Sequence, residues 1–137
     1  MDDTAPQQLA AIASWHAHIY FDGDAERETA LALRAQIAER FAVALGRVHD
    51  RAIGPHPGPM YQVAFDVASF DRVVPWLMLN RRGLTVFVHP NTRDERRDHL
   101  VHALWMGRVL EIDGSRLETD HEPEAALPPN TTPTRPA

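Results

Sequence analysis

The sequence predicts an α+β domain with the ferredoxin-like order strand, helix, strand, strand, helix, strand. Short stretches in which large apolar and polar residues alternate indicate half-buried strands, and longer stretches with apolar residues at helical spacing indicate helices. These stretches follow one another in the order of the split βαβ unit, in which the helices cover one face of an antiparallel sheet. The 137 residues, of which 44% are apolar, suffice for one such domain with a real core.

The expected elements are the six of this unit and one helix added after them. They are a strand at 15–21, a helix at 25–45, a short strand at 47–51, strands at 61–65 and 84–88 with a helix at 69–79 between them, and the added helix at 94–106. Asp22 or Asp24 is suited to cap the first helix, and Gly46 to stop it. Ser69 is suited to cap the second helix, and Gly107 follows the added one.

The chain divides into an N-terminal extension at 1–13, one domain at 14–117 and a tail at 118–137. The tail holds five prolines among Glu, Asn and Thr residues, a composition that does not form a packed element, so we expect it to be disordered. The sheet face without helices needs a cover. A second copy of the chain would supply one, which predicts a homodimer, although the segment after Asn91 could fill the same space.

Composition excludes several classes of function. Fourteen basic and nineteen acidic residues give a formal charge of -5, which argues against nucleic acid or an anionic membrane as a partner. The absence of cysteine excludes disulfides and thiolate metal sites. Residues 1–4 are acidic and begin no apolar signal region, and no apolar run has the length of a membrane span. We therefore expect a soluble, cytoplasmic protein.

Eight histidines are the most informative residues, and alternation along the strands places several of them together. Successive strand side chains point to opposite faces, so His16, His18 and Tyr20 are expected on the face without helices. The same rule places His89 on that face. His56 lies in a turn of glycines and prolines at 54–59, which can hold it rigidly. Three separate segments thus predict one shared site, and histidine is a common ligand of transition metals.

Two more histidines lie on the expected helix at 94–106. His99 and His102 are three residues apart, a spacing that places them on one helix face and would let either reach a shared pocket. A single histidine is more often a hydrogen-bonded structural or surface residue than a ligand. Agreement between several segments is therefore what favours a site over this simpler interpretation.

Five motifs in the same order resemble the DOPA 4,5-dioxygenase family of fungi and bacteria. They are WHAHIYF at 15–21, GPHP at 54–57 with MYQV at 60–63, VPWLMLNRRGL at 74–84, VHP at 88–90 and HALW at 102–105. The resemblance covers roughly residues 14–113. It implies a ferredoxin-like chain that tends to dimerise. It also implies an extradiol dioxygenase that opens the ring of a catechol such as L-DOPA with dioxygen and non-haem iron(II), giving seco-DOPA products that cyclise to betalamic acid or muscaflavin.

For such an enzyme, His18, His56 and His89 are the expected metal ligands. The iron must keep open positions for the catechol and dioxygen, and histidine ligation suits ferrous iron. Many non-haem iron oxygenases also use one carboxylate, for which Glu111 and Asp113 are candidates. Because a three-histidine site also suits zinc, zinc is an alternative cofactor, and it would support hydrolysis or structure instead.

The other roles in the reaction fall to residues near these ligands. His16 or His102 is expected to act as acid and base, since a histidine titrates near neutral pH. Arg81 and Arg82 precede the last strand and are candidates for pairing with the carboxylate of the substrate. Tyr20 shares the open face and is a further substrate-binding candidate. Two alternatives to catalysis remain, namely a non-catalytic metal or small-molecule binding dimer with the same pocket, and a structural dimer whose histidines are polar fillers.

Overall fold

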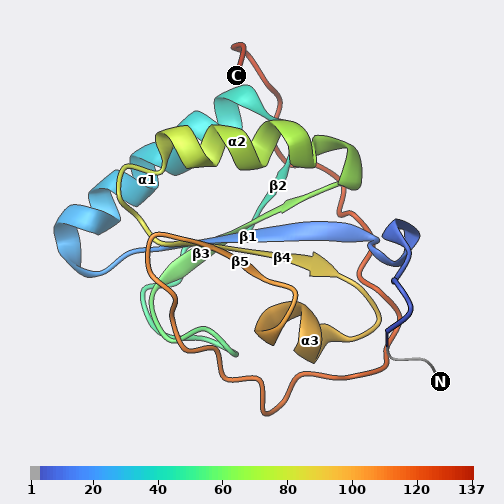
Figure 1. The fold of residues 1–137 in the computed structure, drawn as a ribbon. Helices are drawn as coiled ribbons and strands as arrows, with labels where there is room; N and C mark the ends of the chain where they lie inside the picture. The colour runs from blue at the N-terminus through green and yellow to red at the C-terminus, as the bar shows by residue number, and fades with distance from the viewer. Residues whose placement is uncertain (1–3) are drawn as a thin grey trace.

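A five-stranded antiparallel sheet in the order β2-β3-β1-β4-β5 lies at the centre of the fold (Figure 1). The structure is a computed structural model that describes residues 4–137. The strands are β1 (Ser14–Tyr20), β2 (Ala44–Leu45), β3 (Met60–Phe65), β4 (Val86–Asn91) and β5 (Leu104–Met106). The helices are α1 (Gly23–Arg40), α2 (Phe70–Asn80) and α3 (Glu95–Leu100), with two short 3-10 turns, η1 (Leu9–Ala11) and η2 (Val67–Ser69). The first four strands with α1 and α2 form the predicted ferredoxin-like unit, and β5 extends it beside β4.

The helices α1 and α2 cover one face of the sheet, as the sequence predicts (Figure 1). Alternate strand residues point into the core on this side, among them Ala17 and Ile19 of β1 and Val86 and Val88 of β4. The hydroxyl of Tyr61 donates a hydrogen bond of 2.8 Å to the carbonyl of Ala30 in α1, which ties β3 to the helix. Strand alternation therefore directs the intervening residues of β1 and β4 to the opposite face.

The opposite face is covered by α3 and by the chain that follows β4 (Figure 1). A second apolar cluster forms there from Tyr20, Met60, Phe87 and Ile112. The ring of Trp105 stacks on Phe87 with centroids 4.3 Å apart. The segment after Asn91 thus fills this space, which is one of the two covers that the sequence allows, and the homodimer stays a prediction.

The first helix and the strand after it differ from the prediction. The helix α1 ends at Arg40, because Phe41 takes an extended conformation and buries its side chain in the core. Residues 44–45 then pair with β3, so the apolar residues at the end of the expected helix serve a strand. The strand expected at 47–51 is reduced to one bridge between His49 and Met60. Gly46 stops no helix, and its N–H donates to the carbonyl of Gln62.

The helix expected at 94–106 is also shorter, since α3 ends at Leu100. The N–H groups of Val101 and His102 both donate to the carbonyl of Arg97, which closes the last turn. Residues 104–106 then pair with the edge of β4. Residues 104–106 therefore form backbone hydrogen bonds with the open edge of the sheet and do not continue the helix. At the predicted caps, the side chains of Asp22 and Ser69 form no capping hydrogen bond to α1 or α2.

The last twenty residues form no helix or strand, and they run along the domain (Figure 1). Asn130 pairs with the backbone of β2, accepting from the N–H of Leu45 at 2.8 Å and donating to its carbonyl at 2.9 Å. Earlier in the tail, residues 118–124 lie against α3 and the end of β4. Residues 118–137 thus make specific contacts with the domain. The division of the chain into a domain and a disordered tail stays a prediction.

The N-terminal extension is described from residue 4 onward, and its first three residues lie outside the described part of the chain. The N–H of Ala13 donates to the carbonyl of Asn91, so the extension joins the sheet where β4 ends. Across residues 4–137, none of the helices combines the length and the apolar character that a membrane crossing requires.

Candidate metal centre

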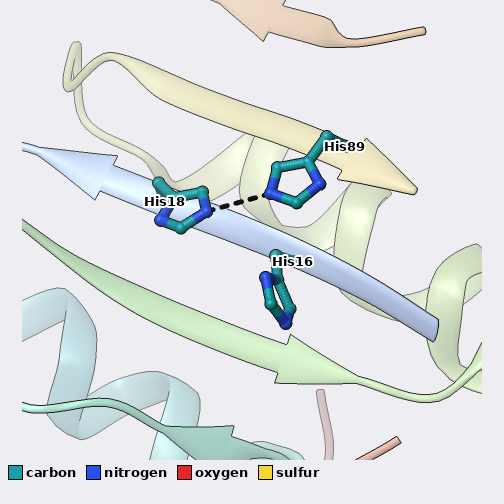
Figure 2. Close-up of side chains that lie close together, drawn as sticks. All are labelled: His16, His18 and His89. Atoms are coloured by element: carbon teal, nitrogen blue, oxygen red, sulfur yellow. Dashed lines mark hydrogen bonds between the residues drawn. The ribbon is translucent and has the colours of Figure 1, made fainter. Parts of the chain in front are cut away.

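Three buried histidines, His16, His18 and His89, lie together on the sheet face opposite α1 and α2 (Figure 2). Each offers one ring nitrogen, and these three atoms lie within 4.8 Å of one another. The register of β1 and β4 produces this arrangement, because His16 is the direct partner of His89 and His18 follows two residues later on the same face. The cluster is therefore built on two central strands.

The tautomer of His89 leaves a lone pair on the nitrogen that is hydrogen-bonded to His18. Its Nδ1 lies 2.9 Å from the carbonyl oxygen of Pro90, which can only accept, so Nδ1 carries the hydrogen and Nε2 keeps its lone pair. The Nε2 atoms of His18 and His89 are 3.2 Å apart. Two nitrogens that each bind one ion at about 2.1 Å are separated by about 3.0 to 3.5 Å at common coordination angles. The observed separation fits a shared ion.

His18 has a second nitrogen, Nδ1, which an ion shared with His89 through Nε2 would not contact. Its ring is almost fully buried, and among the described residues its Nδ1 has no hydrogen-bond partner. An unpaired buried polar atom costs free energy, so side chains of this chain alone do not satisfy the ring. Neutral imidazoles with free lone pairs are the donor set that divalent transition metals prefer. The three residues thus fit a metal ion.

Two further histidines flank the cluster. The ring centroid of His56 is 4.1 Å from that of His18, and its Nδ1 lies 2.6 Å from the hydroxyl of Tyr20. The ring centroid of His99 is 3.9 Å from that of His89. Nδ1 of His99 donates to the carbonyl of Glu95 at 2.8 Å, which leaves its Nε2 unprotonated. Both flanking rings are buried and lie within reach of a molecule bound at the cluster.

Burial keeps these rings neutral. It lowers the pKa of His18 and His89 well below the usual histidine value, and the neighbouring rings lower it further. Burial likewise lowers the pKa of His56 to about 4 and lowers that of His99. At neutral pH all four rings are therefore uncharged, which is the form that binds a metal or accepts a proton.

The histidines line a cavity of about 210 Å³. Its walls are formed by His16, His18, Pro55, His56, Gln62, His89, Asn91, Glu95, Asp98, His99, Leu117, His121 and Glu124. The carboxylate of Glu124 lies 3.6 Å from Nε2 of His16, and this ring lowers the pKa of Glu124. The buried Asp98 accepts from the N–H and the hydroxyl of Thr92, so its carboxylate is held by its own loop.

The structure brings together most of the histidines that the sequence selects. His18 and His89, two expected ligands, belong to the cluster, and His16, an expected acid–base residue, joins them. The third expected ligand, His56, lies beside the cluster with one nitrogen engaged by Tyr20. Tyr20 contacts the site through His56, and its role in substrate binding stays a prediction.

His102 does not line the cavity of the clustered histidines. Because α3 ends at Leu100, His102 does not share a helix face with His99. Its Nδ1 is 3.1 Å from a carboxylate oxygen of Asp98. Its ring lines a separate cavity of about 240 Å³ with Trp15 and residues of the N-terminal extension.

The arginines and carboxylates selected from the sequence also lie outside the cavity. Arg81 donates to the carbonyl of Leu84, and Arg82 donates to the side chain of Gln36 in α1. Glu111 and Asp113 are exposed. Asp113 accepts from the N–H of Ser115 at 3.0 Å.

The sequence assigned no role to two groups at the site. The spacing on the expected helix allowed His99 to reach a shared pocket but gave it no role in the reaction. It gave no sign of Glu124, which lies in the tail and reaches His16 through tertiary structure alone. A polar, proline-rich segment has no periodicity from which such a contact could be inferred.

The chain is similar to known proteins. The model of the Dopa 4,5-dioxygenase family matches residues 15–116. A DOPA 4,5-dioxygenase of Amanita muscaria is 38% identical over 114 residues, which are 77% of this chain and 50% of that protein. The chain thus spans about half the length of this relative. A 21.2 kDa protein of Botryotinia fuckeliana without an assigned function is 34% identical over 134 residues, 90% of this chain and 73% of that protein.

A solved structure has the same fold. The crystal structure of a proposed dioxygenase from Nostoc punctiforme superposes with a TM-score of 0.78 at 50% sequence identity. The match covers 80% of this chain and 95% of the other. The fold therefore belongs to an architecture already seen by experiment.

We predict that the chain binds one divalent metal ion and that His18→Ala weakens this binding by more than about 100-fold, beyond the 10- to 100-fold typical of changes outside the ligand set. Isothermal titration of the chelator-treated protein with Fe²⁺ under anaerobic conditions measures the affinity. His49→Ala, a histidine outside the cavity, is the matched control and should bind as the parent does. Equal affinities for the two variants would exclude this cluster as the metal site.

We also predict that the metal-free protein loses stability as the pH falls from 6.5 to 5. In this window the unfolded chain protonates histidines whose pKa is lowered in the folded state, so the unfolded state binds more protons and the free energy of unfolding decreases. Each such ring contributes a slope of about 1.4 kcal/mol per pH unit. Urea unfolding in the presence of a chelator checks this, and His56→Gln should flatten the slope. A flat profile for the parent would contradict the burial of neutral rings.

Proposed function

The chain belongs to the Dopa 4,5-dioxygenase family, and we propose that it is a ring-cleaving dioxygenase that acts on a catechol such as L-DOPA. The observation that carries the proposal is the convergence of three buried histidines inside the region that the family model matches. The identity to the DOPA 4,5-dioxygenase of Amanita muscaria supports the class of reaction. A catechol and dioxygen would be the substrates, and a cytoplasmic homodimer stays our prediction for location and assembly.

We propose iron(II) as the metal, held by His16, His18 and His89. A ferrous ion would provide open positions at which the catechol and dioxygen meet and would pass electron density between them. The same donor set also suits zinc, which has no redox chemistry and would turn the site into a binding or structural centre. The identity of the metal therefore separates the dioxygenase from the non-catalytic binding module with the same pocket.

The flanking residues are suited to move protons. Neutral His56 can accept a proton from a catechol hydroxyl, and the Tyr20 hydroxyl at its Nδ1 fixes the orientation of the ring. His99 presents an unprotonated Nε2 beside His89 and is a second candidate base. We therefore assign the acid–base roles to His56 and His99, in place of His102, and we assign His16 to the metal.

The size of the cavity favours a small aromatic ring. The cavity volume of about 210 Å³ lies below the usual 300 to 1,000 Å³ of pockets for drug-sized ligands. Pro55 and Leu117 form part of the cavity wall. A second cavity of about 370 Å³ shares these two residues and also contacts Asp113 and Arg116. We propose that the catechol ring enters the inner cavity and that the amino acid end of L-DOPA remains in the outer one.

The charges of the outer cavity are complementary to an α-amino acid. The guanidinium of Arg116 can pair with a carboxylate, and the carboxylate of Asp113 with an ammonium group. Hydrogen bonds from Ser115 lower the pKa of Asp113, so it is ionised at neutral pH. This pair takes the role that the sequence suggested for Arg81 and Arg82, whose guanidinium groups bind other parts of the chain.

We predict that the iron-loaded protein consumes dioxygen and forms a yellow ring-opened product from L-DOPA or another catechol. His18→Ala should lose at least about 100-fold in rate, because a ligand of the metal is removed, whereas His49→Ala should keep the parent rate. An oxygen electrode and the visible spectrum record both signals after anaerobic reconstitution. Absence of oxygen uptake with a broad panel of catechols, in protein shown to hold iron, would rule the proposal out.

A second prediction concerns Arg116. Arg116→Gln should raise KM for L-DOPA by about tenfold, the effect of losing one charge-assisted hydrogen bond, and leave kcat nearly unchanged. The kinetics with 4-methylcatechol, which has no carboxylate, should not change. Arg82→Gln is the matched control on the other side of the sheet. If Arg116→Gln affects both substrates equally, or neither, Arg116 does not recognise the carboxylate.

A further inference from the structure

The C-terminal strap, which we define as residues 118–124, brings a carboxylate to the metal centre from outside the region matched by the family model. We propose that Glu124 is a positioning residue that orients His16 for metal binding. The inference rests on the proposed metal centre, which it extends to a part of the chain that the family match does not include. It is carried by the anchoring of the strap, by the hydrogen bonds of Glu124 and by the position of its carboxylate.

Several bonds hold the strap against α3 and the loop before it. The guanidinium of Arg93 donates to Asp120 at 2.8 and 3.1 Å, and the N–H of His121 donates to the carbonyl of Arg93. The N–H of Arg96 donates to the carbonyl of Glu118. The strap is thus attached to the element that carries His99, and it reaches the cavity in a defined conformation.

The backbone of Glu124 is bound directly to the strands of the site. Its carbonyl accepts a hydrogen bond of 2.5 Å from the hydroxyl of Ser14. That hydroxyl accepts in turn from the side-chain amide of Asn91 at 3.0 Å. Ser14 begins β1 and Asn91 ends β4, and the two are direct partners in the sheet. Glu124 is therefore fixed to the two strands that carry the three histidines.

The side chain of Glu124 lies beside one ring nitrogen of His16, Nε2. Its carboxylate is 3.6 Å from Nε2 of His16, a distance for electrostatic attraction. A carboxylate beside Nε2 favours a hydrogen on that nitrogen and leaves the lone pair on Nδ1 for a metal ion. The carbonyl of Pro90 fixes the tautomer of His89 in the same manner, through the nitrogen that does not face His18.

The geometry favours positioning over direct ligation. In residues 4–137, the ligand atoms that lie within 4.8 Å of one another belong to the three histidines, so the carboxylate of Glu124 stands beside this group. Carboxylates that hydrogen-bond a ligating histidine set its orientation and raise its basicity. Loss of such a partner typically weakens metal binding by about 10- to 100-fold.

The test compares the full-length parent with Glu124→Gln and Glu122→Gln, with Co²⁺ as the probe. Glu122 lies on the same strap, its side chain is 92% exposed, and its carboxylate is 3.7 Å from Arg93, so it is a matched control for loss of one charge. We expect Glu124→Gln to weaken Co²⁺ binding by about 10- to 100-fold. Glu122→Gln should bind as the parent does, and urea unfolding of the metal-free proteins should be the same for both variants.

The outcomes separate this inference from the proposed function. Parent-like affinity in Glu124→Gln would overturn the positioning role and leave the metal centre intact. A Co²⁺ absorption spectrum in Glu124→Gln that shows a lost ligand would also overturn it, in favour of direct ligation. A lower free energy of unfolding for metal-free Glu124→Gln than for metal-free Glu122→Gln would assign Glu124 to structure alone. Failure of the parent to bind Co²⁺ or Fe²⁺ would overturn both the metal centre and the inference.

Discussion

The register between β1 and β4 is the constraint on which the site depends. It sets His16 opposite His89, while Ala17 opposite Val88 points to the helix side. Because side chains alternate with a period of two, a slip of one residue would turn the histidines into the apolar core and the valines into the cavity. Apolar packing beneath α1 and α2 therefore fixes the metal centre on the other face.

Burial lowers the pKa of the histidines, and it also costs free energy of folding. Four adjacent imidazoles with lowered pKa values repel one another when protonated, and one nitrogen of His18 has no partner among the described residues. A bound ion would accept one lone pair from each of the three clustered rings and would stabilise the folded chain by mass action. Phe87 packs beside these rings and Trp105 stacks on Phe87, and an apolar surrounding strengthens each electrostatic interaction of the buried rings.

Period-two alternation made most of the site predictable, because it depends on local sequence. It placed His16, His18 and His89 on one face before any tertiary contact was known, and the rigid turn brought His56 to them. Helix ends were less predictable. The apolar residues after Arg40 and Leu100 have helical spacing, but in both places they pair with the edge of the sheet as short strands. The second of these helices was expected to carry His102, which lies beyond its end.

The remaining parts of the site come from contacts between distant segments. Glu124 meets His16 across more than a hundred residues, and the outer cavity joins the turn at Pro55 to Arg116. Neither contact has a signal in composition or spacing, since each depends on where an irregular segment runs after the sheet has formed. A fold predicted from periodicity thus locates the metal centre, and the tertiary structure is needed for the residues that would orient it and recognise a substrate.

The most direct test of the central claim is mass spectrometry of the product formed from 4-methylcatechol under isotopically labelled dioxygen. The product is reduced at once, so that its aldehyde oxygen does not exchange with water. A ring-cleaving dioxygenase predicts a ring-opened product that carries both labelled oxygen atoms. A product with one labelled atom or none, or an unopened ring, would contradict the account.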